Sequence, residues 1–116
     1  MINDIIVSKR IPKEAILCGN VTHFIRISKK NKWRKNTIFE LKYSYLDEKS
    51  IKVRILKSYE QQVKSISEDV LKGCYYRNKA EFKDQWEKWF QTWDDGAKAW
   101  VVTFKLLDAE QMMSNL

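Results

Sequence analysis

A dense run of basic side chains is the feature of this 116-residue sequence that most plainly indicates chemistry. Residues 26–35 contain six Lys or Arg residues and no acidic residue. Such clusters attract polyanions and release counterions when they bind phosphates, so the binding weakens with salt. The alternative is a solvated loop that only keeps the protein soluble, and charge alone leaves both open. The run consists of Arg26, Lys29, Lys30, Lys32, Arg34 and Lys35.

Aromatic residues accompany this run. Trp33 stands inside it, and Tyr43 and Tyr45 follow shortly afterwards. Aromatic rings within basic segments suit unpaired bases, because the ring stacks on the base while the cations contact phosphates. Two structural alternatives remain open: Trp33 would plug one end of the core, and the tyrosines would form an ordinary strand face.

Residues for catalysis or metal binding are sparse. The chain has one histidine, His23, and two cysteines, Cys18 and Cys74, without CxxC spacing. These are too few ligands for a structural zinc site, and His23 has no recognisable triad partner. No glycine-rich phosphate-binding motif is present. We therefore expect no metal and no cofactor.

Composition bounds the rest. With 44% hydrophobic and 13% aromatic residues, the 116 residues predict a single packed domain spanning 1–116. No apolar run approaches the ~20 residues that span a bilayer, and no signal-peptide pattern begins the chain, so we expect a cytoplasmic protein with reduced thiols and no membrane contact. Residues 1–64 hold 15 basic and 6 acidic side chains, whereas residues 65–116 hold 7 and 9. The positive charge is therefore concentrated in the first half.

Short apolar and β-branched runs between polar segments predict the strands that would position these residues. The clearest is residues 51–56, where Ile51, Val53 and Ile55 alternate with Lys52 and Arg54, so that one face would be buried. The expected strands are Ile5–Ser8, Thr22–Ile27, Ile38–Leu46, Ile51–Leu56 and Ala99–Leu107.

Two short helices are expected from their boundary residues. A first helix would occupy Pro12–Leu17, because proline suits the first turn and Gly19 stands where a helix would stop. Ser65 followed by Glu68 has the form of a capping box, and this second helix would end near Gly73.

A longer helix is expected after Asn78, which with Glu81 repeats the capping pattern. Its aromatic residues follow helical spacing, which favours a core-facing stripe over a ligand-stacking surface. The elements together predict an α+β fold with about five strands and two or three short helices. The stripe is Phe82, Trp86, Trp89, Phe90 and Trp93.

Three runs in this order resemble the ASCH family: ILCGNVTHFIRISKKNKW, SISEDVLKGCYYRNKAEFKDQW and WDDGAKAWVVTF. The resemblance covers roughly Pro12 to Leu107 and is nearest to the small stand-alone ASCH proteins of phages and prokaryotes. It implies a PUA-like mixed β-barrel of about five to six strands with two to three short helices. It also implies a cleft beside the signature strand and RNA-related functions.

One ASCH subgroup resembles amidohydrolases of acylated cytidine that use a Lys, a Thr and a Glu. In this sequence those positions fall on Val21, Phe24 and Cys74, while Thr22 and Arg26 are kept. Valine and phenylalanine can neither move a proton nor act as nucleophiles, so this chemistry is expected to be absent.

Two glycine positions of the family also differ. One falls on Asn36, which tolerates a positive φ, and the other falls on Tyr75, so that the rim of the cleft would be remodelled there.

The leading hypothesis is a non-catalytic module that binds RNA or another nucleic acid. Cations would contact phosphates, Trp33 or Tyr43 would stack on a base, and Thr22 would hydrogen-bond a sugar or base edge. The expected site residues are Thr22, Arg26, Lys29, Lys30, Lys32, Trp33, Arg34, Lys35 and Tyr43.

Two alternatives stay open. One is an RNA-directed hydrolase or ribonuclease with a non-standard residue set, in which His23, Cys74 and Tyr76 would act with Lys29 or Arg26. For Cys74, a buried apolar role is favoured over a reactive thiolate. The other is a phage accessory protein that binds an acidic host protein through the basic face.

Overall fold

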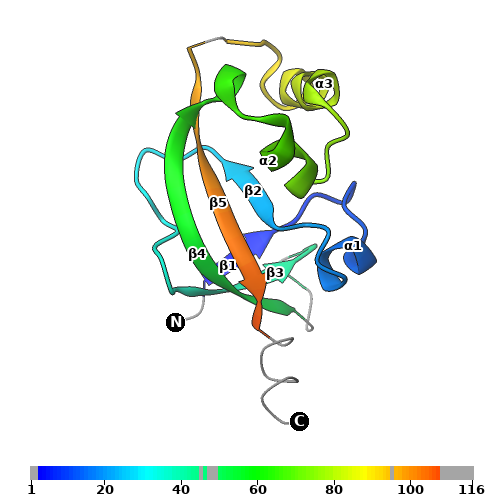
Figure 1. Cartoon of the computed structure of the whole chain (residues 1–116), viewed down its shortest axis with the longest axis vertical. Coiled ribbons are helices and arrows are strands. Elements are labelled where there is room, and N and C mark those ends of the chain that lie inside the picture. Colours follow the sequence, from blue (N-terminus) through cyan, green and yellow to red (C-terminus); the bar gives the residue numbers. More distant parts are fainter. Residues whose placement is uncertain (1–2, 45, 47–49, 95, 108–116) are drawn as a thin grey trace.

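Five strands form one mixed sheet in the part of the chain that the computed structural model describes, which is residues 3–44, 46, 50–94 and 96–107. The strand order is β1-β3-β4-β5-β2 (Figure 1). β1 runs parallel to β3, and the other neighbouring pairs are antiparallel. The α+β class is confirmed. The strands are β1 (Asn3–Ile6), β2 (His23–Arg26), β3 (Ile38–Lys42), β4 (Ile51–Gln62) and β5 (Lys98–Leu106).

The sheet remains open along one line. β1 and β2 are its two edge strands, and within the described residues no strand pairing joins them. Edge strands leave backbone N–H and C=O groups without ladder partners, so these groups must be satisfied in another way. We call the line between β1 and β2 the seam.

β4 is twice as long as the alternating pattern predicted, with 12 residues instead of the six of Ile51–Leu56. Its pairing with β5 shifts register between Ile55 and Lys57, which marks a bulge. A bulge bends a strand and changes which side chains face inward, so the alternation that identifies residues 51–56 stops there. The bent strand continues to Gln62 and is visibly curved in Figure 1.

Other strand ends differ by a few residues. The first strand begins and ends two residues earlier than predicted, and the third ends at Lys42 instead of Leu46. These are the errors expected where apolar runs continue beyond the last hydrogen-bonded pair.

The helices are α1 (Lys13–Leu17), a short 3-10 helix η1 (Val63–Ser65), α2 (Glu68–Gly73) and α3 (Lys79–Phe90). Pro12 is the N-cap of α1 rather than a residue of its first turn, so this helix begins one residue later than predicted. Asn78 precedes α3 as predicted, and its side chain accepts a hydrogen bond from the Glu81 N–H. The predicted cap at Ser65 is wrong. Ser67 caps α2 by accepting from the Val70 N–H, because the chain first makes η1. None of the described helices is long and apolar enough to cross a membrane.

Two hydrophobic clusters cover the two faces of β5, so its buried residues do not alternate simply. On one face, Val102 and Phe104 join the cluster that includes Ile16 of α1. On the other, Val101 joins the cluster beneath α2 and α3, with Leu71 and Phe82. Figure 1 shows α2 and α3 together on one side of the long strands. These two helices therefore complete the core beside the seam.

α2 meets the start of β2 at a close approach that requires glycine. The Thr22 N–H donates to the Gly73 carbonyl at 2.9 Å. A Cβ at Gly73 would lie 2.5 Å from His23 Nδ1 and 2.7 Å from Thr22 Oγ1. These two atoms are themselves held together at 2.7 Å, so neither can move aside easily.

We predict that Gly73→Ala destabilises the protein by about 1–3 kcal/mol in chemical denaturation, because the new methyl group forces β2 away from α2. Gly96→Ala is the control, since the nearest atom to its Cβ would be 3.4 Å away, and it should change stability by less than about 0.5 kcal/mol. Equal stability of both variants would contradict the packing described for Gly73.

Candidate nucleic-acid interface

The connection between β2 and β3, residues 27–37, carries most of the predicted cations, and we call it the basic loop. Arg26 precedes the loop as the last residue of β2. In Figure 1 the loop runs along the edge of β4 away from α2 and α3. Its exposed cations are Lys29, Lys30, Lys32, Arg34 and Lys35.

Side-chain hydrogen bonds hold the basic loop on the sheet. The Asn31 amide donates to Ser58 Oγ of β4 at 2.9 Å, and Ser58 Oγ donates to the Trp33 carbonyl at 2.6 Å. The Trp100 indole N–H of β5 donates to the Ser28 carbonyl at 3.0 Å. These contacts fix the loop backbone on the sheet, so the exposed cations project from a well-ordered segment.

The loop also rejoins the sheet in a defined way at its end. The Asn36 N–H donates to the Ile55 carbonyl at 2.8 Å, and the Ile55 N–H donates to the Thr37 carbonyl at 2.9 Å. Asn36 has φ of 70°, and Tyr75 has φ of 69°. Asn36 and Tyr75, which stand where the ASCH resemblance places glycines, therefore both adopt the backbone conformation that glycine favours.

Trp33 lies in the core, which is the alternative that the sequence left open. Its side chain is only 6% exposed, and its ring meets Phe24 edge-on with 6.2 Å between centroids. Stacking on a base would require the indole to leave this packing.

The two remaining predicted residues make internal contacts. Tyr43 is half-buried and donates from its hydroxyl to the Ile11 carbonyl at 2.6 Å, and Thr22 Oγ1 contacts His23 Nδ1 at 2.7 Å. Burial, and secondly Glu14, raise the pKa of Tyr43. Tyr45 lies outside the described residues. These two hydrogen bonds tie Thr22 to His23 and Tyr43 to Ile11, rather than to the exposed cations.

A cavity of about 250 Å³ opens along the seam, and we call it the seam cavity. β1 and β2 form two of its sides, and α3 with the residues before it forms another. Three exposed apolar residues line it and so mark its mouth: Ile27 is 53% exposed, Trp89 47% and Phe90 45%. Ile27 is also the first residue of the basic loop, so the mouth adjoins the loop.

Arg26 ties the two edges of the open sheet together inside this cavity. Its guanidinium donates to the Ile6 carbonyl of β1 at 3.0 Å and to the Ile25 carbonyl of β2 at 2.9 Å. Burial lowers the pKa of Arg26, and nearby Arg10 lowers it further, but arginine remains protonated at neutral pH.

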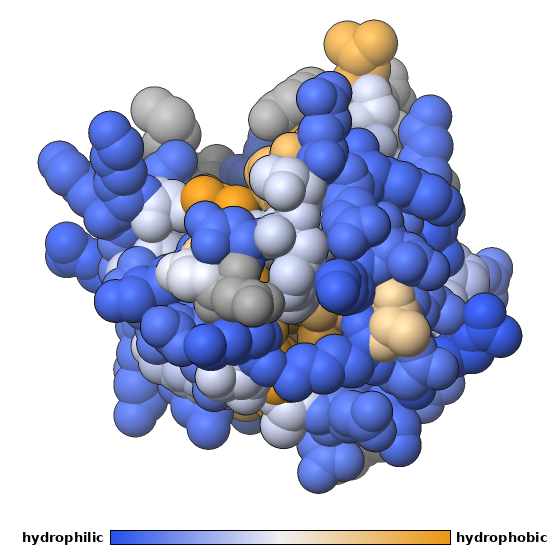
Figure 2. All heavy atoms as spheres, turned by 90° about the horizontal axis from the view of Figure 1, so that it is seen from above, coloured by the Kyte–Doolittle hydropathy of each residue, from blue (hydrophilic) through white to orange (hydrophobic). Residues whose placement is uncertain are grey.

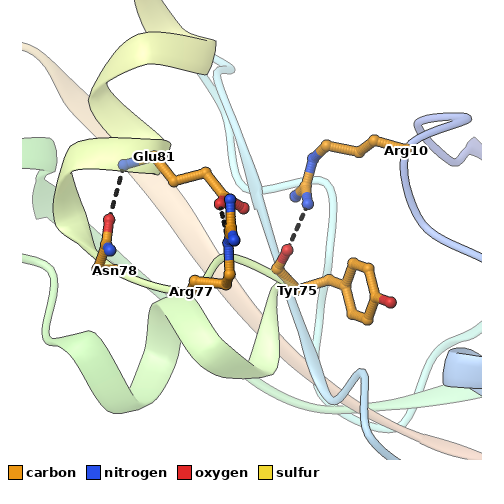
Figure 3. A network of polar contacts seen from close by, with 5 residues as sticks. All are labelled: Arg10, Tyr75, Arg77, Asn78 and Glu81. Atoms are coloured by element: carbon orange, nitrogen blue, oxygen red, sulfur yellow. Dashed lines mark hydrogen bonds and ion pairs between the residues drawn. The ribbon is translucent and has the colours of Figure 1, made fainter.

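Arg10 is the second guanidinium of the seam cavity. It donates to the carbonyls of Tyr75 at 2.6 Å and Cys74 at 2.7 Å, and it stacks 3.7 Å above the Tyr76 ring. Figure 3 shows the Arg10 side chain pointing toward the Tyr75 carbonyl, with the hydrogen bond between them as a dashed line. The buried Nε–H of Arg10 has no hydrogen-bond partner in the part of the chain that the structure describes.

No carboxylate lines the seam cavity among the described residues. The nearby acid is Glu81, which lines a neighbouring hollow with Arg10 and Arg77. Its carboxylate accepts from Arg77 Nε at 2.7 Å (Figure 3). That hydrogen bond lowers the pKa of Glu81. The seam cavity therefore holds two cations with apolar walls and no internal counter-charge.

The remaining polar groups of the seam cavity are neutral. Burial, helped by Lys57, lowers the pKa of His23. Burial raises the pKa of Tyr76, and raises that of the Cys74 thiol to about 12 despite Arg10 and Arg26. Within the described ranges, no three His, Cys, Asp or Glu side chains gather as metal ligands would.

The positions of the amidohydrolase subgroup are apolar and buried here. Val21, Phe24 and Cys74 are each less than 10% exposed, and all three line the seam cavity. A cavity exists where the resemblance implies a cleft, but these three side chains offer it no nucleophile and no base.

Sequence reasoning missed Arg10, Trp89 and Phe90 as residues of this site. Arg10 lies in a segment without any local pattern and reaches the site only through the tertiary fold. Trp89 and Phe90 belong to the aromatic stripe that was predicted to face the core, and only Phe82 and Trp86 of α3 are fully buried. The last helical turn overhangs the open seam, so its rings stay partly in solvent.

The surface above α2 and α3 is mostly polar. In Figure 2, seen from above, hydrophilic side chains dominate, and hydrophobic atoms show only in small separate areas, some at the bottom of hollows. This face offers polar and charged contacts rather than one broad apolar patch.

We predict that Cys74 resists alkylation in the folded protein. At pH 8 a thiol with a pKa of about 12 is thiolate in roughly one molecule in ten thousand, and the side chain is also buried. In a Cys18→Ser variant, which removes the exposed thiol, iodoacetamide should modify Cys74 only after urea is added. Rapid modification without urea would contradict the buried, protonated thiol.

Comparisons with known proteins give the fold a precedent. No family model matches the sequence, and no curated protein matches it. Two solved structures share the fold at 11% and 12% identity. The first is an ASCH domain from Lactobacillus crispatus JV V101, with a TM-score of 0.69 over 80% of this chain and 68% of that one. The second is protein EF3133 from Enterococcus faecalis V583, of family DUF984, with a TM-score of 0.56 over 81% and 68%. This chain has an ASCH-like fold.

Proposed function

We propose that this protein is an RNA-binding module whose basic loop contacts the phosphate backbone. One observation carries the proposal: five exposed cations project from a loop that hydrogen bonds fix on the sheet. Phosphate contacts supply most of the affinity for nucleic acids, and a pre-ordered loop loses little entropy on binding. The ASCH-like fold supports the same class of ligand.

The charges of the basic loop are available to a ligand. No ion pair joins the five cations to an acidic side chain of the described residues. By contrast, Arg77 outside the loop is paired with Glu81. Unpaired surface cations keep their counterions until a polyanion displaces them, and this release favours binding at low salt.

Trp89 and Phe90 are better placed than Trp33 to stack on a base. Both rings are almost half exposed at the mouth of the seam cavity, whereas Trp33 is buried. Single-stranded RNA could therefore lay its phosphates along the basic loop and its unpaired bases on these rings. Thr22 and Tyr43, which the sequence also predicts as site residues, are assigned no RNA contact in this arrangement.

We propose binding rather than nucleophilic catalysis because the reactive groups at the site are held in inert forms. The Cys74 thiol has a pKa of about 12, and Tyr76 is buried with a raised pKa. Neither is ionised at neutral pH, so neither is a nucleophile activated by a lowered pKa.

The basic loop can be tested by the salt dependence of binding. We expect Lys29, Lys30 and Lys32 together changed to Gln to weaken binding of single-stranded RNA and to reduce the slope of log K against log salt by about 2. Fluorescence anisotropy at several salt concentrations measures both quantities, and a DNA oligonucleotide of the same sequence measures the role of the 2′-hydroxyl.

The matched control changes Lys79, Lys88 and Lys98 to Gln, which removes the same charge from exposed positions on α3 and β5. It should alter the slope much less. If the control lowered the slope as much as the loop variant, binding would be non-specific to the surface charge, and the loop would not be the site.

The stacking role of α3 has its own test. We predict that Trp89→Ala weakens RNA binding by about five- to a hundredfold, which corresponds to the loss of one base–aromatic stack. Leu17→Ala is the control, because Leu17 is similarly exposed on α1, at 51%. An unchanged affinity for Trp89→Ala would exclude this ring from the interface.

A further inference from the structure

We propose that the seam cavity binds the phosphorylated end of a nucleic acid strand, with Arg10 and Arg26 holding the terminal phosphate monoester. The inference rests on the proposed function, since the basic loop would hold the rest of the strand. It adds a chemical preference for one kind of end that backbone binding alone does not require.

Both guanidiniums have N–H groups that do not donate to backbone carbonyls. Each has five N–H bonds, and on each guanidinium two of them donate to backbone carbonyls. The buried Nε–H of Arg10 also has no hydrogen-bond partner among the described residues. Phosphate oxygens match the fork of donors that arginine presents.

Among the described residues that line the seam cavity, none is a carboxylate that could balance the charge of the two arginines. Arg10 and Arg26 line the same cavity, and the charge of Arg10 is one of the causes that lower the pKa of Arg26. Glu81 shares the neighbouring hollow with Arg10 and feels its charge, but its carboxylate is hydrogen-bonded to Arg77 and does not line the seam cavity. A bound anion would relieve this repulsion in a site that is poorly screened because its walls are apolar.

The charge of the two arginines favours a terminal phosphate over an internal one. A phosphate monoester carries about −1.5 to −2 charges at pH 7, close to the two cations, whereas an internal diester carries one. The Arg26 side chain also bridges β1 and β2 across the seam. A strand therefore cannot run along the seam past this bridge, but its end can enter from the mouth.

The mouth fits the nucleoside that such an end carries. Trp89, Phe90 and Ile27 are exposed there and line the same cavity as the arginines. A ring of the terminal base would stack on these side chains while its phosphate points inward. The following phosphates would leave toward the basic loop, which begins at Ile27.

The test compares four versions of one fluorescent single-stranded RNA, with a hydroxyl or a phosphate at the 5′ end and at the 3′ end. We expect one phosphorylated end to bind at least about tenfold more tightly than its hydroxyl counterpart, because charge-assisted hydrogen bonds are gained. The pair that differs identifies which end enters the cavity.

Two variants place this preference in the cavity. Arg10→Gln removes one guanidinium. Ser8→Asp keeps both arginines but puts a carboxylate on the cavity wall. The new side chain can still accept a hydrogen bond from the backbone N–H of Arg10, as the Ser8 hydroxyl does. Within each variant the phosphorylated and hydroxyl ends should bind alike. Circular dichroism and denaturation check that both variants fold, and the second remains informative if the first does not.

The outcomes separate the two proposals. Equal binding of all four RNAs by the natural sequence, with a normal salt slope, would overturn the cavity inference and leave the basic loop in place. A preference that survives in a folded variant would also overturn it. Absence of salt-dependent binding to every RNA would instead reject the proposed function.

Discussion

The bridge that Arg26 makes across the seam is the interaction on which the site depends. Its guanidinium satisfies a carbonyl on each of the two edge strands, Ile6 of β1 and Ile25 of β2, where a closed barrel would have ladder hydrogen bonds. The sheet is thereby held close to closure while a cavity remains between its edges. Because the bridging group is a buried cation that no acidic side chain of the described residues pairs with, the cavity acquires a positive potential together with its shape.

The surroundings of the seam reinforce that potential instead of cancelling it. Arg10 enters from the loop after β1 and is held by the Cys74 and Tyr75 carbonyls, and Tyr75 adopts a positive φ of 69° at that point. A tyrosine in this conformation is strained, so the packing around it must fix it. The basic loop adds further positive charge outside the seam cavity, and hydrogen bonds from Ser58 and Trp100 hold its backbone on the sheet. Interior and surface cations would thus form two parts of the proposed polyanion-binding region.

The sequence predicted the class of fold, the succession of elements and the basic loop, because periodicity, caps and charge runs are local properties. Asn78 capped its helix as predicted, and alternation found the start of β4. What failed depended on tertiary contacts. The bulge after Ile55 ended the alternation, and Trp33 entered the core although its neighbours are charged. Arg10 joined the site from a distant segment, and no spacing rule could link it to Arg26.

The central claim is that the basic loop and the mouth of the seam cavity together form the nucleic-acid interface. Titration of ¹⁵N-labelled protein with a short single-stranded RNA, followed by two-dimensional NMR, tests it residue by residue. The account predicts shifts in the backbone amides of residues 27–37 and in the Trp89 indole N–H, while the buried Trp33 indole changes little. The claim would be contradicted by shifts confined to β3 or to residues of α3 other than Trp89 and Phe90, or by the absence of shifts at low salt.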